Sequence, residues 1–127
     1  FRSLDDRRIR VSKCVQLKDA LVGTGFPFKE LSRLDLYLRQ LKTMMTSSAG
    51  VRRAGAAALD LAYVACGRLD AFWEMGLSRW DMAAGALLIL EAGGLVGDVQ
   101  GGPGYLDRGE IATAPPKVMP QLLEALR

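Results

Sequence analysis

The sequence contains no histidine, only two cysteines and no long hydrophobic run. Without histidine, Ser-His-Asp and Cys-His catalysis and most zinc sites are excluded, so any chemistry must use carboxylates, hydroxyls, amides or a metal that they hold. Cys14 and Cys66 lie far apart without CxxC spacing, which argues against a disulfide framework and favours a reducing, cytoplasmic compartment. The longest uncharged stretches have nine residues, whereas a membrane span needs about 20.

The sequence also has no strong excess of positive or negative charge. The 17 basic and 14 acidic residues give a net charge of +3, which does not by itself indicate a nucleic-acid partner. The 127 residues, 50% of them hydrophobic, suffice for one domain with a buried core. Charges among the first eight residues argue against a secretory signal, and no linker or repeat divides the chain.

Short apolar runs alternate with longer helix-like segments along the chain. We expect strands over residues 8–15, 20–22, 51–54, 69–75, 95–99 and 111–114. We expect helices over residues 31–45, 56–66, 81–92 and 120–127. This order predicts a layered α/β fold.

Two of these helices carry further signals. In the first helix, apolar side chains recur at steps of three and four, at Leu31, Leu34, Leu38, Leu41 and Met45. We interpret this stripe as the face that packs on the sheet, and a dimer seam is the alternative. In the third helix, Asp81 is the expected N-cap and Gly93-Gly94 the expected stop.

Two features are candidates for a ligand site. Glu74 at the end of a strand and Asp81 at the start of a helix would face one crevice at the sheet edge, where α/β proteins bind ligands. The plainer interpretation is a solvated glutamate and an N-cap. Gly55, Ala56 and Ala57 open a helix without a capping side chain, which leaves amide donors for an oxygen-rich ligand. Close helix packing would explain these small residues equally well.

Two other features are weaker candidates. Arg52 and Arg53 could meet phosphate or carboxylate, although adjacent arginines are usually solvated or paired. The loop over residues 101–104 lacks the spacing of phosphate-binding loops and is better interpreted as a connector. Residue types and spacing alone leave the function open.

Specific sequence motifs narrow the choice of function. Gly-Ala-Ala-Ala-Leu-Asp at 55–60 is followed by Trp-Asp-x-Ala-Ala-Gly at 80–85 and Glu-Ala-Gly-Gly at 91–94. Together with Thr-Gly-Phe-Pro at 24–27, these motifs resemble the inositol monophosphatase family. The resemblance implies that residues 1–127 are the C-terminal half of that fold, a layered mixed sheet with helices.

The resemblance also implies a Mg²⁺-dependent, lithium-sensitive phosphomonoesterase, and we expect the intact protein to hydrolyse inositol 1-phosphate. We expect a homodimer as well, because loss of a covering layer of the fold would expose apolar surface and favour self-association. Asp81 would be a magnesium ligand, and Glu74 would hydrogen-bond hydroxyls of the inositol ring. Gly55, Ala56 and Ala57 would contact the substrate, although many relatives have Ser or Thr where Ala56 stands. Ser78-Arg79 replaces the common Arg-Pro or Lys-Pro before Trp-Asp, which bears on subunit contacts.

The family's N-terminal half carries a metal-binding glutamate and an Asp-Pro-x-Asp-Gly-Thr motif, and no such motif occurs in this sequence. The chain would therefore supply substrate contacts and one metal ligand but no catalytic group, and we expect it to be inactive by itself. One alternative is a related phosphatase for fructose bisphosphate, adenosine 3′,5′-bisphosphate or histidinol phosphate. Another is an inactive fragment or regulatory dimerisation module, with the leucine stripe, Phe72 and Trp73 facing a partner.

Overall fold

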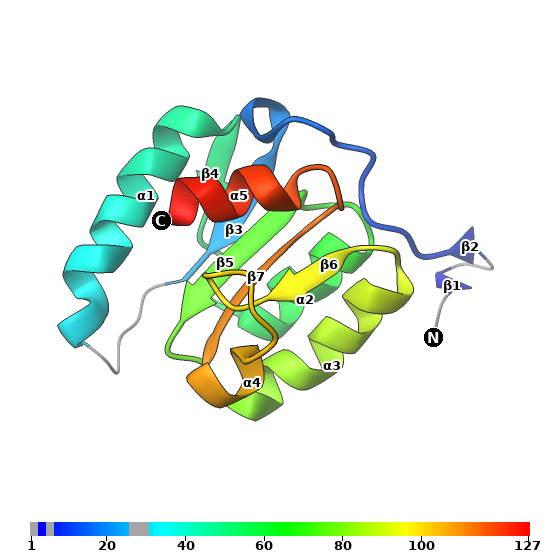
Figure 1. The fold of residues 1–127 in the computed structure, drawn as a ribbon. Helices are drawn as coiled ribbons and strands as arrows, with labels where there is room; N and C mark the ends of the chain where they lie inside the picture. Colours follow the sequence, from blue (N-terminus) through cyan, green and yellow to red (C-terminus); the bar gives the residue numbers. More distant parts are fainter. Residues whose placement is uncertain (1–2, 5–6, 26–30) are drawn as a thin grey trace.

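A five-stranded mixed sheet forms the middle layer of the computed structural model, which describes residues 3–4, 7–25 and 31–127 (Figure 1). Its strands, in spatial order, are β4 (Gly50–Arg52), β3 (Leu21–Thr24), β5 (Ala71–Met75), β7 (Glu110–Ala114) and β6 (Leu95–Gly97). Strand β3 runs parallel to both of its neighbours, whereas β7 is antiparallel to β5 and β6. Two short antiparallel strands, β1 (Ser3–Leu4) and β2 (Arg7–Arg8), pair separately.

Helices cover both faces of this sheet (Figure 1). One face carries α1 (Leu34–Ser47) and α5 (Met119–Leu126), and the other carries α2 (Ala57–Ala65) and α3 (Arg79–Glu91). Shorter helical segments are η1 (Leu17–Asp19), η2 (Leu31–Arg33) and α4 (Tyr105–Arg108). The helix–sheet–helix layers confirm the predicted α/β fold.

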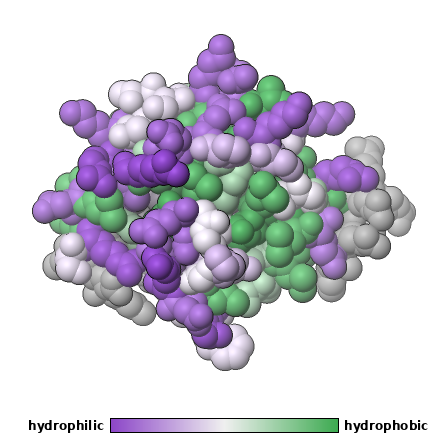
Figure 2. Space-filling model, in the orientation of Figure 1, coloured by the Kyte–Doolittle hydropathy of each residue, from purple (hydrophilic) through white to green (hydrophobic). Residues whose placement is uncertain are grey.

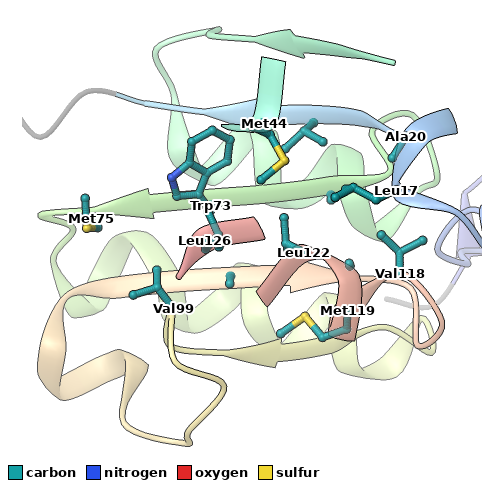
Figure 3. Close-up of a cluster of buried hydrophobic side chains, with 14 of the residues drawn as sticks. Leu17, Ala20, Met44, Trp73, Met75, Val99, Val118, Met119, Leu122 and Leu126 are labelled. Atoms are coloured by element: carbon teal, nitrogen blue, oxygen red, sulfur yellow. The ribbon is translucent and has the colours of Figure 1, made fainter. Parts of the chain in front are cut away.

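The core under α1 and α5 is built around Trp73 (Figure 3). Its indole packs near the ring of Tyr37, with 6.0 Å between centroids. The indole Nε1 donates a hydrogen bond to Gln40 Oε1 at 3.2 Å, and Gln40 Nε2 donates to the carbonyl of Leu126 at 3.1 Å. These bonds satisfy a buried amide and tie α1 to both β5 and α5.

The core under α2 and α3 depends on close approach of the two helices. Leu61 of α2 and Met82 and Ile89 of α3 are fully buried there. A Cβ atom at Gly85 would lie 2.6 Å from the Cβ of Leu61, so only glycine permits this crossing.

The predicted sheet-facing stripe on α1 is wrong. Leu34, Leu38 and Met45 are 36%, 47% and 64% exposed, and Leu41 is half-buried. The side chain of Leu31 lies outside the described residues. The buried positions are Tyr37, Gln40 and Met44. On this buried face Gln40 makes two hydrogen bonds inside the protein, and a polarity pattern cannot foresee a glutamine at a core position.

Two other expectations fail. The strand expected at 8–15 is wrong, because residue 8 ends β2 and residues 9–16 form no regular element. That segment instead crosses α3's end, where the Val11 amide donates to the carbonyl of Ala92 at 3.1 Å. Phe72 and Trp73 are fully buried, so they cannot form a partner surface as this protein is folded.

Apolar surface nevertheless remains exposed. Figure 2 shows hydrophobic residues gathered in the middle of one face between hydrophilic borders. On α3, Trp80 is 90% exposed and Leu87 is 60% exposed. Within the described ranges, no helix combines the length and apolar character that crossing a bilayer would need.

Candidate functional site

The carboxyl ends of the parallel strands β3, β4 and β5 meet at one edge of the sheet. Thr24 pairs with Trp73 in the β3–β5 register, so Gly25 follows on one strand where Glu74 follows on the other. Arg53 comes directly after β4 at the same edge. An open α/β sheet binds ligands at this kind of position.

Glu74 lies on the α2 side of the sheet, with its carboxyl group directly over Gly25. A Cβ atom at residue 25 would lie 2.2 Å from Glu74 Oε1 and 2.5 Å from its carboxyl carbon, so the side chain occupies space that only glycine leaves free. Burial is the main reason that the pKa of Glu74 is raised from 4.5 to about 7. The charges of Asp60 and Asp81 raise this pKa further, and Arg53 lowers it.

Asp81 lies in the first turn of α3 but is not the N-cap of this helix, so the N-cap predicted from the sequence is wrong. Ser78 is the N-cap, and Asp81 stands at the third helical position in a capping box. Asp81 Oδ2 accepts hydrogen bonds from the Ser78 amide at 3.2 Å and from Ser78 Oγ at 2.8 Å. Among the described residues, Asp81 Oδ1 accepts no hydrogen bond, and the residue is exposed. One oxygen therefore fixes the side chain while the other faces solvent.

The start of α2 has the open geometry that the sequence predicts. Ala56 is the N-cap and offers no side-chain hydrogen bond. Gly55 has a φ of +84°, and a Cβ atom there would meet no described atom within 4 Å. Gly55 and Ala56 are exposed and Ala57 is half-buried, so the first amides of α2 are accessible to an oxygen-rich ligand.

The two weaker candidates, the arginine pair and the loop over residues 101–104, differ in their relation to the candidate site. Arg52 and Arg53 are both exposed, and the charge of Arg53 acts on Glu74, which associates it with the crevice. The loop over 101–104 is instead held by Asp98, whose Oδ1 accepts from the amides of Gln100 and Gly102, both at 2.9 Å. This supports the interpretation of the loop as a connector.

The sequence matches the model of the inositol monophosphatase family over residues 2–127. The chain belongs to this family. A protein named Nus factor SuhB from Pseudomonas aeruginosa is 53% identical over 98% of the chain and 47% of the relative. An inositol-1-monophosphatase from Mesorhizobium japonicum is 47% identical over 98% of the chain and 47% of the relative.

Solved structures agree with this family assignment. The extragenic suppressor protein suhB of Bartonella henselae superposes with a TM-score of 0.91 at 45% identity, over 97% of this chain and 47% of that one. Inositol monophosphatase from Anabaena superposes with a TM-score of 0.89 at 38% identity, over 96% of this chain and 48% of the Anabaena chain. The inositol monophosphatase-family chain thus spans about half the length of the relatives it matches.

This inositol monophosphatase-family chain does not contain a full set of metal ligands within its described residues. No group of three or more His, Cys, Asp or Glu side chains lies close enough there to hold a metal ion. The open Oδ1 of Asp81 has the hard-oxygen chemistry that Mg²⁺ prefers. The donor set therefore fits one contribution to a magnesium site rather than the whole site.

Asp60 is the site residue that sequence reasoning missed. Asp60 is the charged residue of α2, and the sequence patterns assign it no role of its own. Asp60 is 3% exposed in the first turn of α2, and burial raises its pKa. The available signal was a charged residue in an otherwise apolar helix opposite two glycines, Gly23 and Gly25, on one strand.

Proposed function

We propose that the intact protein is a Mg²⁺-dependent phosphomonoesterase that hydrolyses inositol 1-phosphate, with this chain supplying substrate contacts and one metal ligand. Membership of the family supports phosphatase chemistry. The relative from Mesorhizobium japonicum, named inositol-1-monophosphatase, supports the substrate. We extend the proposal to lithium sensitivity, in line with the family resemblance, and to a cytoplasmic homodimer, in line with the cysteine pattern and the exposed apolar surface.

The observation that carries this proposal is the pairing of two different carboxyl environments at one sheet edge. Glu74 is partly buried over Gly25, whereas Asp81 is exposed with Oδ1 open. The two are close enough for the Asp81 charge to act on Glu74. A buried carboxyl group suits hydroxyl recognition, and an exposed, anchored carboxylate suits a hard cation.

In this proposal Asp81 holds Mg²⁺ together with residues from the rest of the intact protein. The ion, when bound, supplies charge neutralisation on the phosphoryl oxygens. Ser78 fixes the orientation of Asp81 through the capping box, so the open oxygen keeps its direction. Glu74 orients the alcohol part of the substrate, and the amides at Gly55, Ala56 and Ala57 face its oxygen atoms.

The direct test replaces Asp81 by Asn in the intact protein. We expect kcat with inositol 1-phosphate and Mg²⁺ to fall by about a hundredfold or more, because a metal ligand is lost. Asp19→Asn is the matched control, because it makes the same exchange at an exposed aspartate before β3, at the opposite end of the strands. Calorimetric Mg²⁺ binding that is unchanged in Asp81→Asn would contradict the assignment, whatever the activity.

A second candidate is a Nus-factor role, because the relative named Nus factor SuhB is 53% identical to this chain. The two functions can be separated in a Pseudomonas aeruginosa strain that lacks its own Nus factor SuhB. If intact Asp81→Asn restores growth without hydrolysing phosphate esters, the Nus-factor role does not depend on the proposed chemistry. If neither wild type nor variant restores growth, this second role is refuted.

A further inference from the structure

Gly23 of β3 and Gly25, directly after the end of this strand, both face the α2 side of the sheet. A Cβ atom at residue 23 would lie 3.0 Å from Leu69, 3.1 Å from Phe72 and 3.8 Å from Asp60 Cγ. A Cβ atom at residue 25 would collide with the Glu74 carboxyl group. Residues two apart on a strand share a face and lie roughly 7 Å apart. The carboxyl groups of Asp60 and Glu74 therefore both lie over this glycine-containing segment.

The two carboxyl groups differ in accessibility. Asp60 is 3% exposed, whereas Glu74 is half-buried, so Glu74 is the more accessible of the two carboxyl groups to a ligand. No hydrogen bond to the Asp60 carboxyl group is present among the described residues. In that part of the chain no side-chain nitrogen or oxygen that is sealed from solvent lacks a hydrogen-bond partner. A carboxyl group this deeply buried is costly to ionise, and burial raises the pKa of Asp60.

We propose that Asp60 is a positioning residue of the substrate site, whose charge near Glu74 sets the orientation and hydrogen-bonding role of the Glu74 carboxyl group toward a polyol hydroxyl. This inference rests on the proposed function. It predicts a preference for phosphate monoesters whose alcohol carries further hydroxyls over simple aryl phosphates. The preference would arise because a protonated carboxyl group both donates and accepts hydrogen bonds, as a hydroxyl does.

The charges around Glu74 support this role. The crevice presents Asp60 from α2, Asp81 from α3 and Arg53 from the segment after β4, and Tyr37 of α1 also senses the Glu74 charge. Burial is the largest cause that raises the pKa of Glu74, and Asp60 is the first of the charges that add to it. Removing the Asp60 charge should therefore make Glu74 a fully ionised acceptor at lower pH.

The first experiment follows the Glu74 carboxyl group itself, in the intact protein without metal or substrate. Carbon-13 NMR with labelled glutamate resolves its titration, and Glu74→Gln identifies the signal. We expect Asp60→Asn to lower the Glu74 pKa toward the usual range for glutamate. Asp19→Asn, which removes an exposed charge before β3 at the opposite end of the strands, should leave it unchanged. An unchanged titration in Asp60→Asn overturns the positioning role.

The second experiment is a double-mutant cycle in the KM of the intact enzyme. We expect Asp60→Asn to raise KM for inositol 1-phosphate about tenfold with a smaller change in kcat, and to leave KM for p-nitrophenyl phosphate unchanged. In the Glu74→Gln background the same substitution should have no further effect, because Asp60 acts through Glu74. Additive effects, or equal effects on both substrates, overturn the inference.

These outcomes separate the two proposals. A wild-type protein that hydrolyses neither ester refutes the proposed function and, with it, the substrate preference. A shifted titration in that case still establishes the coupling between Asp60 and Glu74. A wild type that is active, with an unshifted titration in Asp60→Asn, refutes only the role of Asp60. Thermal unfolding of each variant identifies any change that arises from lost folding.

Discussion

Gly25→Ala tests whether the place of Glu74 over β3 matters for function. A methyl group at residue 25 would lie 2.2 Å from Glu74 Oε1, and ordinary contact begins at 3.4 Å, so the carboxyl group must retreat by about 1.2 Å. The displaced atoms are the end of a flexible side chain, so stability should change by less than about 1 kcal/mol. A misplacement of this size can cost up to roughly a hundredfold in rate.

We therefore expect kcat/KM of the intact Gly25→Ala protein for inositol 1-phosphate to fall by about ten- to a hundredfold. Steady-state kinetics and urea unfolding measure the two effects side by side. Gly93→Ala is a control for glycine replacement away from the crevice, at the end of α3, and should lower stability without changing substrate preference. Unchanged kcat/KM in Gly25→Ala would show that substrate does not use the Glu74 carboxyl group in this position.

The remaining predictions concern stability and activity. Gly85→Ala should destabilise the fold by about 1–3 kcal/mol in urea unfolding, because its methyl would lie 2.6 Å from the fixed Cβ of Leu61. Ser78→Ala should cost about 1 kcal/mol through the lost cap, measured in the same way. The pKa of Glu74 rises on folding from 4.5 to about 7, because the folded state favours the protonated carboxyl group. The contribution of Glu74 to the free energy of unfolding is therefore fully present below pH 4.5 and is lost as the pH rises through 7. Glu74→Gln should therefore flatten the pH dependence of Tm in that window; an unaltered slope would contradict the raised pKa. The 127-residue chain alone should hydrolyse no inositol 1-phosphate, and measurable turnover would refute the need for further ligands.

Local patterns were enough to predict where several candidate site residues lie along the helices and strands. The position of Glu74 near the end of β5, the uncapped start of α2 and the glycine stop after α3 depend on neighbouring residues in the sequence. Turn chemistry and missing caps act within a few residues, so they are visible before folding. The family motifs likewise lie in continuous strings, which is why the family assignment was confirmed.

The tertiary structure decided what depends on distant contacts. The buried face of α1 includes Gln40 because Trp73 and Leu126 offer it partners, and no periodicity encodes those partners. Likewise, the parallel register of β3 with β5 brings Gly25 beneath Glu74 across about 50 residues of chain. The sequence by itself determined the alternation of the main strands and helices from residue 20 onward and the family, since these follow from local propensity and motif. Only packing placed Asp60 near Glu74, because burial and charge at a site are properties of the assembled layers.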